Sequence, residues 1–244
     1  MKKILSILTL KHYIIIGVVV VGASAFFFSG GVSRSSSKAI NLIPKNTVAV
    51  GVVCVGDMIT KADIEELLKL DLDIIEDVLK KQKDFAEQME DESELAASIL
   101  SDPTNIGIDI TKDIFIYGVI EDFMKQEGYL CVSGVVADKK RLLEILEELE
   151  SQTKMFKIDE EDDYSIIITE GDRDVVAFAW DEDNFLFITH PDKYRWSKKD
   201  IKNLEDEVDR LFNLESDEKL TSVSSFSKLY NNKTDLCAWV SAEG

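Results

Sequence analysis

The sequence predicts an α+β fold, a mainly antiparallel sheet with helices packed on one face, that follows a single apolar segment at the amino terminus. Between Lys154 and His190, four apolar runs are joined by acidic turns so short that neighbouring strands must be antiparallel. Helical spacing of apolar residues recurs behind capping residues at several places. Thr47–Val55 is rich in β-branched residues and is bounded by Pro44 and Gly56, which is typical of a buried strand.

The apolar segment Tyr13–Phe28 decides where the protein works. Its 16 uncharged residues would form a helix of about 24 Å, slightly shorter than the roughly 30 Å hydrocarbon core of a bilayer. Ala23-Ser24-Ala25 also fits a signal-peptidase site, so the alternative is secretion after cleavage near Ala25. Three phenylalanines, Phe26–Phe28, follow that site and suit an interfacial anchor better than a new amino terminus. We therefore expect a retained membrane anchor.

The same segment predicts an extracytoplasmic body. All three lysines before Gly31 precede the apolar run, which holds the amino terminus on the cytoplasmic side. A helix buried in a soluble protein is the remaining interpretation. The chain then divides into residues 1–29 as membrane anchor or signal, 30–39 as a flexible Gly/Ser tether, and 40–244 as the folded domain.

Two helices are predicted between Thr60 and Leu100. Thr60 and Asp63 form a capping box of the aspartate type, and Asp102-Pro103 ends the run. The apolar positions at near-helical spacing are Ile64, Leu67, Leu68, Ile74, Ile75, Val78, Leu79, Phe85 and Met89.

Two strands and a helix come next. The strands are Ile114–Ile120 and Tyr129–Ala137, and Asp138 caps the helix. The apolar stripe of that helix consists of Leu142, Ile145, Leu146 and Leu149, and its wet side of Glu144, Glu147, Glu148 and Glu150.

A four-strand meander and another helix complete the pattern. The meander strands are Lys154–Ile158, Tyr164–Thr169, Asp174–Trp180 and Phe185–His190. Ser197 and Asp200 open the helix, whose inward residues are Ile201, Leu204, Val208, Leu211 and Phe212.

The last stretch, Lys233–Gly244, is similar to Asn46–Asp57 in its order of turn residue, threonine and apolar run. A second copy of the module could therefore start near residue 234. Chance similarity between two strands is the alternative, and Thr234–Ala242 could also pair into the sheet of the one domain.

Charge excludes several partners. Residues 32–244 hold 25 basic against 47 acidic side chains, a net charge of −22, so this body repels nucleic acid and anionic membrane surfaces. The three cysteines, Cys54, Cys131 and Cys237, lie in apolar runs without CxxC spacing, which predicts buried free thiols.

No motif for catalysis or nucleotide binding is present. The sequence lacks GxSxG, GxxxxGK[ST], GxGxxG and HExxH, and His190 is the one histidine of the body, which we interpret as a strand-end residue. We therefore assign no catalytic, cofactor-binding or metal-ligating residue, and expect no enzyme activity and no cofactor.

Acidic turns form the one arguable site. In an up-and-down meander alternate turns share an end, so two acidic turns should lie about 10 Å apart, close enough to share Ca²⁺. Their residues are Asp159, Glu160, Glu161, Asp162 and Asp163 in one turn and Asp181, Glu182 and Asp183 in the other. Solvated turns without a site are the favoured interpretation, because no EF-hand spacing occurs. Glycosidase chemistry is disfavoured, because turn carboxylates have equivalent surroundings.

Aromatic residues cluster near the last meander strand and could form a binding platform for carbohydrate or peptide. They are Trp180, Phe185, Phe187, Tyr194 and Trp196. Core packing is the favoured interpretation, because Phe185 and Phe187 alternate as inward strand residues do.

The order of these features resembles a known family. LIPKNTVAVGVV, GIDITKDIFIYG, GYLCVSGVVADKKRLLEIL, YSIIIT and DNFLFITH are similar to an uncharacterised family of Bacteroidetes cell-envelope proteins, domain of unknown function 4836, over nearly all of residues 42–244. The resemblance implies an exported protein with two related halves and carries no activity. Many members look like lipoproteins, whereas this sequence lacks a lipobox cysteine.

Three functions are compatible with the sequence. The first is a non-enzymatic, membrane-tethered extracytoplasmic domain that binds or supports another cell-envelope protein or polymer. The second is a carboxylate-dependent hydrolase, which a pocket holding acids of shifted pKa would favour. The third is a Ca²⁺-binding adhesion module.

Overall fold

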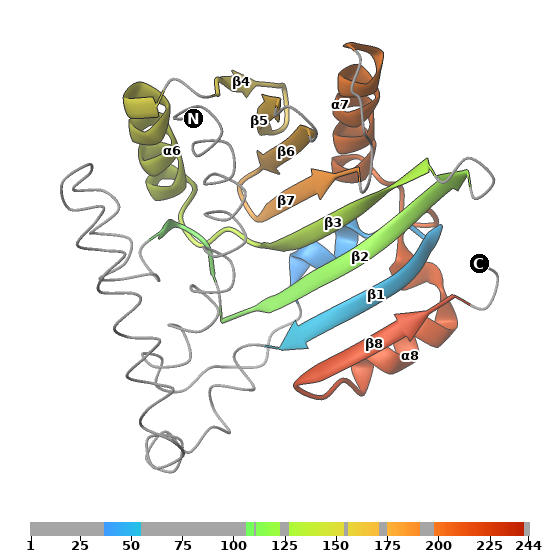
Figure 1. Ribbon diagram of the computed structural model, residues 1–244. Coiled ribbons are helices and arrows are strands. Elements are labelled where there is room, and N and C mark those ends of the chain that lie inside the picture. Colours follow the sequence, from blue (N-terminus) through green and yellow to red (C-terminus); the bar gives the residue numbers. More distant parts are fainter. Residues whose placement is uncertain are drawn as a thin grey trace, which may run out of the picture.

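The computed structural model describes residues 37–54, 106–109, 111–122, 127–153, 156–170, 175–190 and 198–241. Eight strands of these residues form one sheet in which every neighbouring pair is antiparallel, in the order β4-β5-β6-β7-β3-β2-β1-β8 (Figure 1). The strands are β1 (Thr47–Cys54), β2 (Asp113–Asp122), β3 (Glu127–Val135), β4 (Ile158–Glu160), β5 (Ser165–Glu170), β6 (Val175–Trp180), β7 (Asn184–Thr189) and β8 (Leu236–Val240). The helices are η1 (Lys38–Leu42), α6 (Lys139–Thr153), α7 (Lys198–Phe212), η3 (Leu220–Ser222) and α8 (Ser224–Asn231).

The predicted α+β class is confirmed, and the predicted strands of the described residues are present, with one shift. The first meander strand is β4, which begins at Ile158 and includes Asp159 and Glu160, two acids that the sequence placed in a turn. The predicted strand at 234–242 exists as β8 and pairs with β1 inside this sheet. The two helices predicted between residues 60 and 100 lie outside the described residues.

The main core lies on one face of the sheet, beneath η1, α7 and α8. Alternate strand residues reach this face, for example Leu186 and Ile188 of β7, and meet Leu204 of α7 and Phe226 of α8. The inward stripe predicted for the helix after Ser197 is therefore correct.

Helix α6 covers the opposite face, so the helices are not confined to one face as the sequence analysis expected. Leu142 of α6 packs in a second cluster with Trp180 and Phe185, whose strand neighbours point into the main core. Gly134 of β3 lies beneath the Phe185 ring, and a Cβ on Gly134 would come within 2.5 Å of that ring. Apolar residues on both sides of β6 and β7 require cover on both sides.

The predicted amino-terminal anchor or signal segment, residues 1–29, and most of the predicted tether lie outside the described residues. Within the part of the chain that the structure describes, no helix has the length and apolar character needed to span a membrane.

The three cysteines are free, as predicted. Cys54 and Cys131 are buried, while Cys237 is only partly so. Burial, and secondarily the nearby Asp113, raises the pKa of the Cys54 thiol to about 12. Such a thiol stays protonated at neutral pH and is a poor nucleophile.

Candidate functional site

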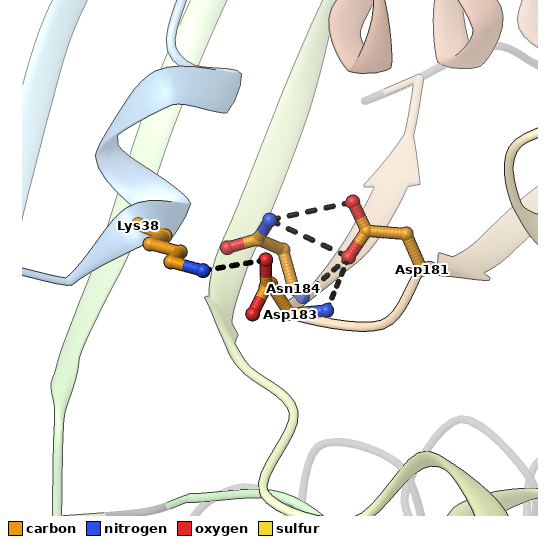
Figure 2. Close-up of polar contacts among 4 residues, drawn as sticks. All are labelled: Lys38, Asp181, Asp183 and Asn184. Atoms are coloured by element: carbon orange, nitrogen blue, oxygen red, sulfur yellow. Dashed lines mark hydrogen bonds and ion pairs between the residues drawn. The ribbon is translucent and has the colours of Figure 1, made fainter.

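The turn between β6 and β7 is stabilised by its own first acid, Asp181. The Asp181 Oδ1 atom accepts hydrogen bonds from the backbone N–H of Asp183 at 2.7 Å and of Asn184 at 2.6 Å (Figure 2). The Asn184 side-chain amide lies 3.4 Å from both carboxylate oxygens. This arrangement is an aspartate turn, in which the carboxylate replaces backbone partners. Asp181 therefore has a structural role in the turn.

The other two acids of this turn form ion pairs with segments far away in the chain. The Lys38 ammonium of η1 lies 2.7 Å from Asp183 Oδ2, as Figure 2 shows, and that of Lys139 in α6 lies 2.8 Å from Glu182 Oε1. The Lys38 and Asp183 side chains are 66% and 51% exposed, so each pair adds little stability. Their effect is to offset the charges of two of the three acids of the turn, where the starts of η1 and α6 meet it.

Replacing Asp181 by alanine is expected to destabilise the fold by about 1–2 kcal/mol, because two backbone N–H groups lose a charged acceptor. Asp183→Ala removes only an exposed pair and should cost at most about 0.5 kcal/mol. Urea denaturation of the two variants measures the difference. Equal losses would show that the Asp181 hydrogen bonds do not hold the turn.

The turn between β4 and β5 lies beside the acidic side of α7. The Tyr164 ring stacks on Phe212 of α7 with centroids 4.9 Å apart. Burial raises the pKa of Tyr164 to about 12, with Asp209 and Glu161 adding to the rise. Partial desolvation, followed by the charges of Asp206 and Glu161, also raises the pKa of Glu205. These like charges repel one another across the two elements.

This repulsion gives a pH dependence. A carboxyl whose pKa is raised in the folded state binds its proton more tightly there, so its effect on stability is unfavourable at neutral pH and disappears on acidification. Glu205→Gln should therefore raise the free energy of unfolding at pH 7, by less than about 0.5 kcal/mol because water screens an exposed group.

The gain in stability from Glu205→Gln should vanish below the ordinary glutamate pKa of about 4.3. At such a pH the protonated Glu205 of the parent and the glutamine of the variant are both uncharged. Glu147→Gln on the exposed side of α6 serves as control and should change stability little at either pH. Thermal melts at both pH values provide the measurement. A gain that persists in acid would contradict the electrostatic explanation.

The predicted placement of the two acidic turns at one end of the meander is topologically correct. Both turns lie at the same end of the meander, between β4 and β5 and between β6 and β7. Their carboxylates interact with different neighbours, as described above. Among the described residues, no group of three or more His, Cys, Asp or Glu side chains is placed to hold a metal ion.

Three of the five aromatic residues of the predicted cluster lie among the described residues. Trp180 and Phe185 are buried in the second cluster, which confirms core packing for these two. Phe187 is half-buried on β7, while Tyr194 and Trp196 lie outside the described residues. The His190 ring meets Tyr129 edge-on with centroids 5.9 Å apart, at the end of β7 as the sequence indicated.

A shallow depression of about 360 Å³ lies at the carboxyl end of α6. It is lined by Glu147, Glu150, Ser151 and Phe156. Glu147 is exposed and Glu150 is half-buried, so both carboxylates are in contact with solvent.

A buried charged cluster was not predicted. Asp113 at the start of β2 forms an ion pair with Lys233, and its Oδ2 atom accepts the Tyr230 hydroxyl at 2.6 Å. The Lys233 ammonium also lies 4.1 Å from the centre of the Tyr230 ring. The Asp113 side chain is 8% exposed and that of Lys233 is 18% exposed. This cluster connects β2 to the segment between α8 and β8, and its groups satisfy one another.

The fold and these turns define an α+β domain with one antiparallel sheet and acids held in turns and ion pairs. The chain belongs to the family described as domain of unknown function 4836, whose model matches residues 39–244. No curated protein and no solved structure matches the chain.

Proposed function

We propose that the chain is a non-enzymatic, membrane-tethered extracytoplasmic domain that binds or supports another component of the cell envelope. The observation that carries the proposal is the placement of the described acids. Those of the meander turns serve as turn caps, exposed ion pairs and a like-charged surface. The two carboxylates that line the described depression, Glu147 and Glu150, are exposed and half-buried rather than enclosed. A hydrolase that used carboxylates would need a pair of them in contrasting surroundings.

The amino-terminal sequence supports the tether. Tyr13–Phe28 is uncharged and follows basic residues, and a polar segment rich in glycine and serine separates it from the domain. Net charge supports a protein or neutral polymer as partner, because 47 acidic against 25 basic side chains in residues 32–244 repel anionic surfaces.

Fractionation of cells that produce the tagged full chain tests the tether. The expected result is a membrane-bound protein that resists alkaline washing, keeps residues 1–29 and is digested by protease from the extracytoplasmic side. A variant with Ile15→Lys and Val20→Asp should lose membrane attachment, because charges are costly in hydrocarbon. A soluble cytosolic chain, or a soluble mature protein that begins at Phe26, would contradict the tether.

Crosslinking of the full chain in envelopes, followed by capture through the tag, tests the binding role. The expected result is one reproducible partner that depends on a folded domain. A thermal melt with and without Ca²⁺ separates the adhesion alternative, because a ligand of the folded state raises the melting temperature. A rise with Ca²⁺ would favour the adhesion module over this proposal.

A further inference from the structure

The register in which β1 pairs with β8 matches the sequence similarity between the segments that contain these two strands. Aligning Asn46–Asp57 with Lys233–Gly244 residue by residue makes Gly51 the counterpart of Ala238. In the sheet, Gly51 is the residue that faces Ala238. Each central residue therefore pairs with its own counterpart.

The flanking pairs exchange around that point. Val50 faces Trp239, which is the counterpart of Val52, and Val52 faces Cys237, which is the counterpart of Val50. The Gly51–Ala238 pair is therefore the centre of both comparisons, the sequence alignment of the two segments and the register of β1 against β8. A local two-fold axis through this pair relates the two strands. The two strands are related by this axis as two copies of one element are.

The two strands differ in what covers their far edges. The far edge of β1 is paired with β2, whereas β8 is the last strand of the sheet among the described residues (Figure 1). Rotation about the local axis carries β2 onto the uncovered edge of β8. That edge is therefore equivalent to an edge which, in this same sheet, holds an antiparallel strand.

The backbone of β8 is available at that edge. Cys54 N–H donates to the Asp235 carbonyl at 2.8 Å, and Ser241 N–H donates to the Val48 carbonyl at 2.9 Å. Because directions alternate along an antiparallel strand, Leu236, Ala238 and Val240 direct their N–H and C=O groups away from β1. The Leu236 carbonyl accepts the Thr234 hydroxyl at 3.1 Å, in agreement with this direction.

The two edges of the sheet are protected very differently. Edge strands usually avoid pairing by being short or charged, and β4 at the other edge has three residues, two of which are acids. By contrast, β8 has five residues, LCAWV, without charge or proline. Its residues Leu236 and Val240 are 66% and 71% exposed. An edge of this kind accepts an added strand.

We propose that the outer edge of β8 is an interaction surface that receives an extended, uncharged apolar peptide segment as an added antiparallel strand, in the position that β2 has against β1. The inference rests on the proposed binding role of the domain and assigns the surface and the partner chemistry. Main-chain hydrogen bonds supply affinity, and side chains that meet Leu236 and Val240 supply selectivity. A second copy of the chain is disfavoured as partner, because each body has 47 acidic against 25 basic side chains and the two would repel.

A peptide with the uncharged central part of the β2 sequence, Ile114–Ile120, labelled with a fluorophore, is the probe. Fluorescence anisotropy measures its binding to the full chain in lipid nanodiscs, with empty nanodiscs as blank. Ala238→Pro removes an outward N–H and leaves the hydrogen bonds to β1 in place, so affinity should fall roughly tenfold or more. Ala238→Val keeps the N–H and the extended backbone, and should bind within about twofold of the parent.

A second variant, without proline, shows whether a loss of binding by Ala238→Pro comes from the blocked edge or from misfolding. Leu236→Lys with Val240→Lys changes two exposed side chains, and it should also abolish binding because charges at an edge oppose strand addition. Failure of the peptide to bind, or unchanged binding by both variants, would overturn the proposal. So would self-association by sedimentation that Ala238→Pro abolishes, since the partner would then be a second copy. An envelope component captured equally by the parent and by Ala238→Pro would overturn the edge surface and leave the proposed function intact.

Discussion

Replacing Lys233 by methionine is expected to lower the free energy of unfolding by about 3–5 kcal/mol, one of the two largest effects among the substitutions considered. Lys233 is the cation paired with buried Asp113, whose other partner is the Tyr230 hydroxyl. Methionine retains the apolar stem and removes the charge, which leaves a carboxylate in a poorly solvated position. Tyr230 also loses the cation over its ring. Urea denaturation of the purified chain measures the change.

Two variants separate the loss of a buried charge from the loss of any lysine. Lys228→Met changes an exposed lysine of α8 and should alter stability by at most about 0.5 kcal/mol. Asp113→Asn combined with Lys233→Met leaves no unpaired charge and keeps an acceptor for Tyr230, so it should recover most of the loss. If Lys233→Met were no worse than Lys228→Met, the ion pair would contribute nothing to the fold.

The elements that the sequence predicts well are those whose stability is local. The turns of the meander and the apolar stripe of α7 depend on residues a few positions apart, so spacing is enough to find them. Helix α8, Ser224–Asn231, was missed because its eight residues are too few to show a period. It forms because Phe226 and Tyr230 pack into the core, which is a property of the tertiary structure.

Helical spacing alone could not predict which face of the sheet each helix covers. A stripe such as Leu142 and Leu146 shows that α6 has an apolar side, but it does not show which face of the sheet that side meets. The available signal was the β6 sequence VVAFAW, which is apolar at every position. A strand that is apolar throughout indicates burial on both faces, and the structure places helices on both.

The contacts of the candidate site were predictable only in part. The order of the meander strands brings both acidic turns to one end, and that part followed from the sequence. Lys38 and Lys139, which pair with acids of the turn between β6 and β7, come from η1 and α6. Because they are far from that turn in the sequence, local spacing does not predict these pairs. The same holds for Asp113 and Lys233, which adjoin β2 and β8, strands separated by β1 in the sheet.

Trp180→Ala is expected to destabilise the chain by about 3–5 kcal/mol, the usual cost of removing a large aromatic side chain from a core. Trp180 is fully buried, and its ring packs on Phe178 with centroids 5.5 Å apart. Alanine leaves a cavity between the sheet and α6 that the surrounding strands cannot close. Chemical denaturation gives the loss, and hydrogen exchange should show α6 opening more readily than α7, because α7 packs on the other face.

Trp180→Phe is the matched control for shape and polarity. The Trp180 Nε1 atom is buried without a hydrogen-bond partner among the described residues, so phenylalanine removes an unsatisfied donor along with some volume. The two effects oppose each other, and the net loss should be below about 1.5 kcal/mol. Equal losses of stability for Trp180→Ala and Trp180→Phe would mean that the indole group itself, and not its volume, stabilises the packing between the sheet and α6. Uniformly faster exchange in α6 and α7 would mean that the two faces of the sheet unfold as one unit.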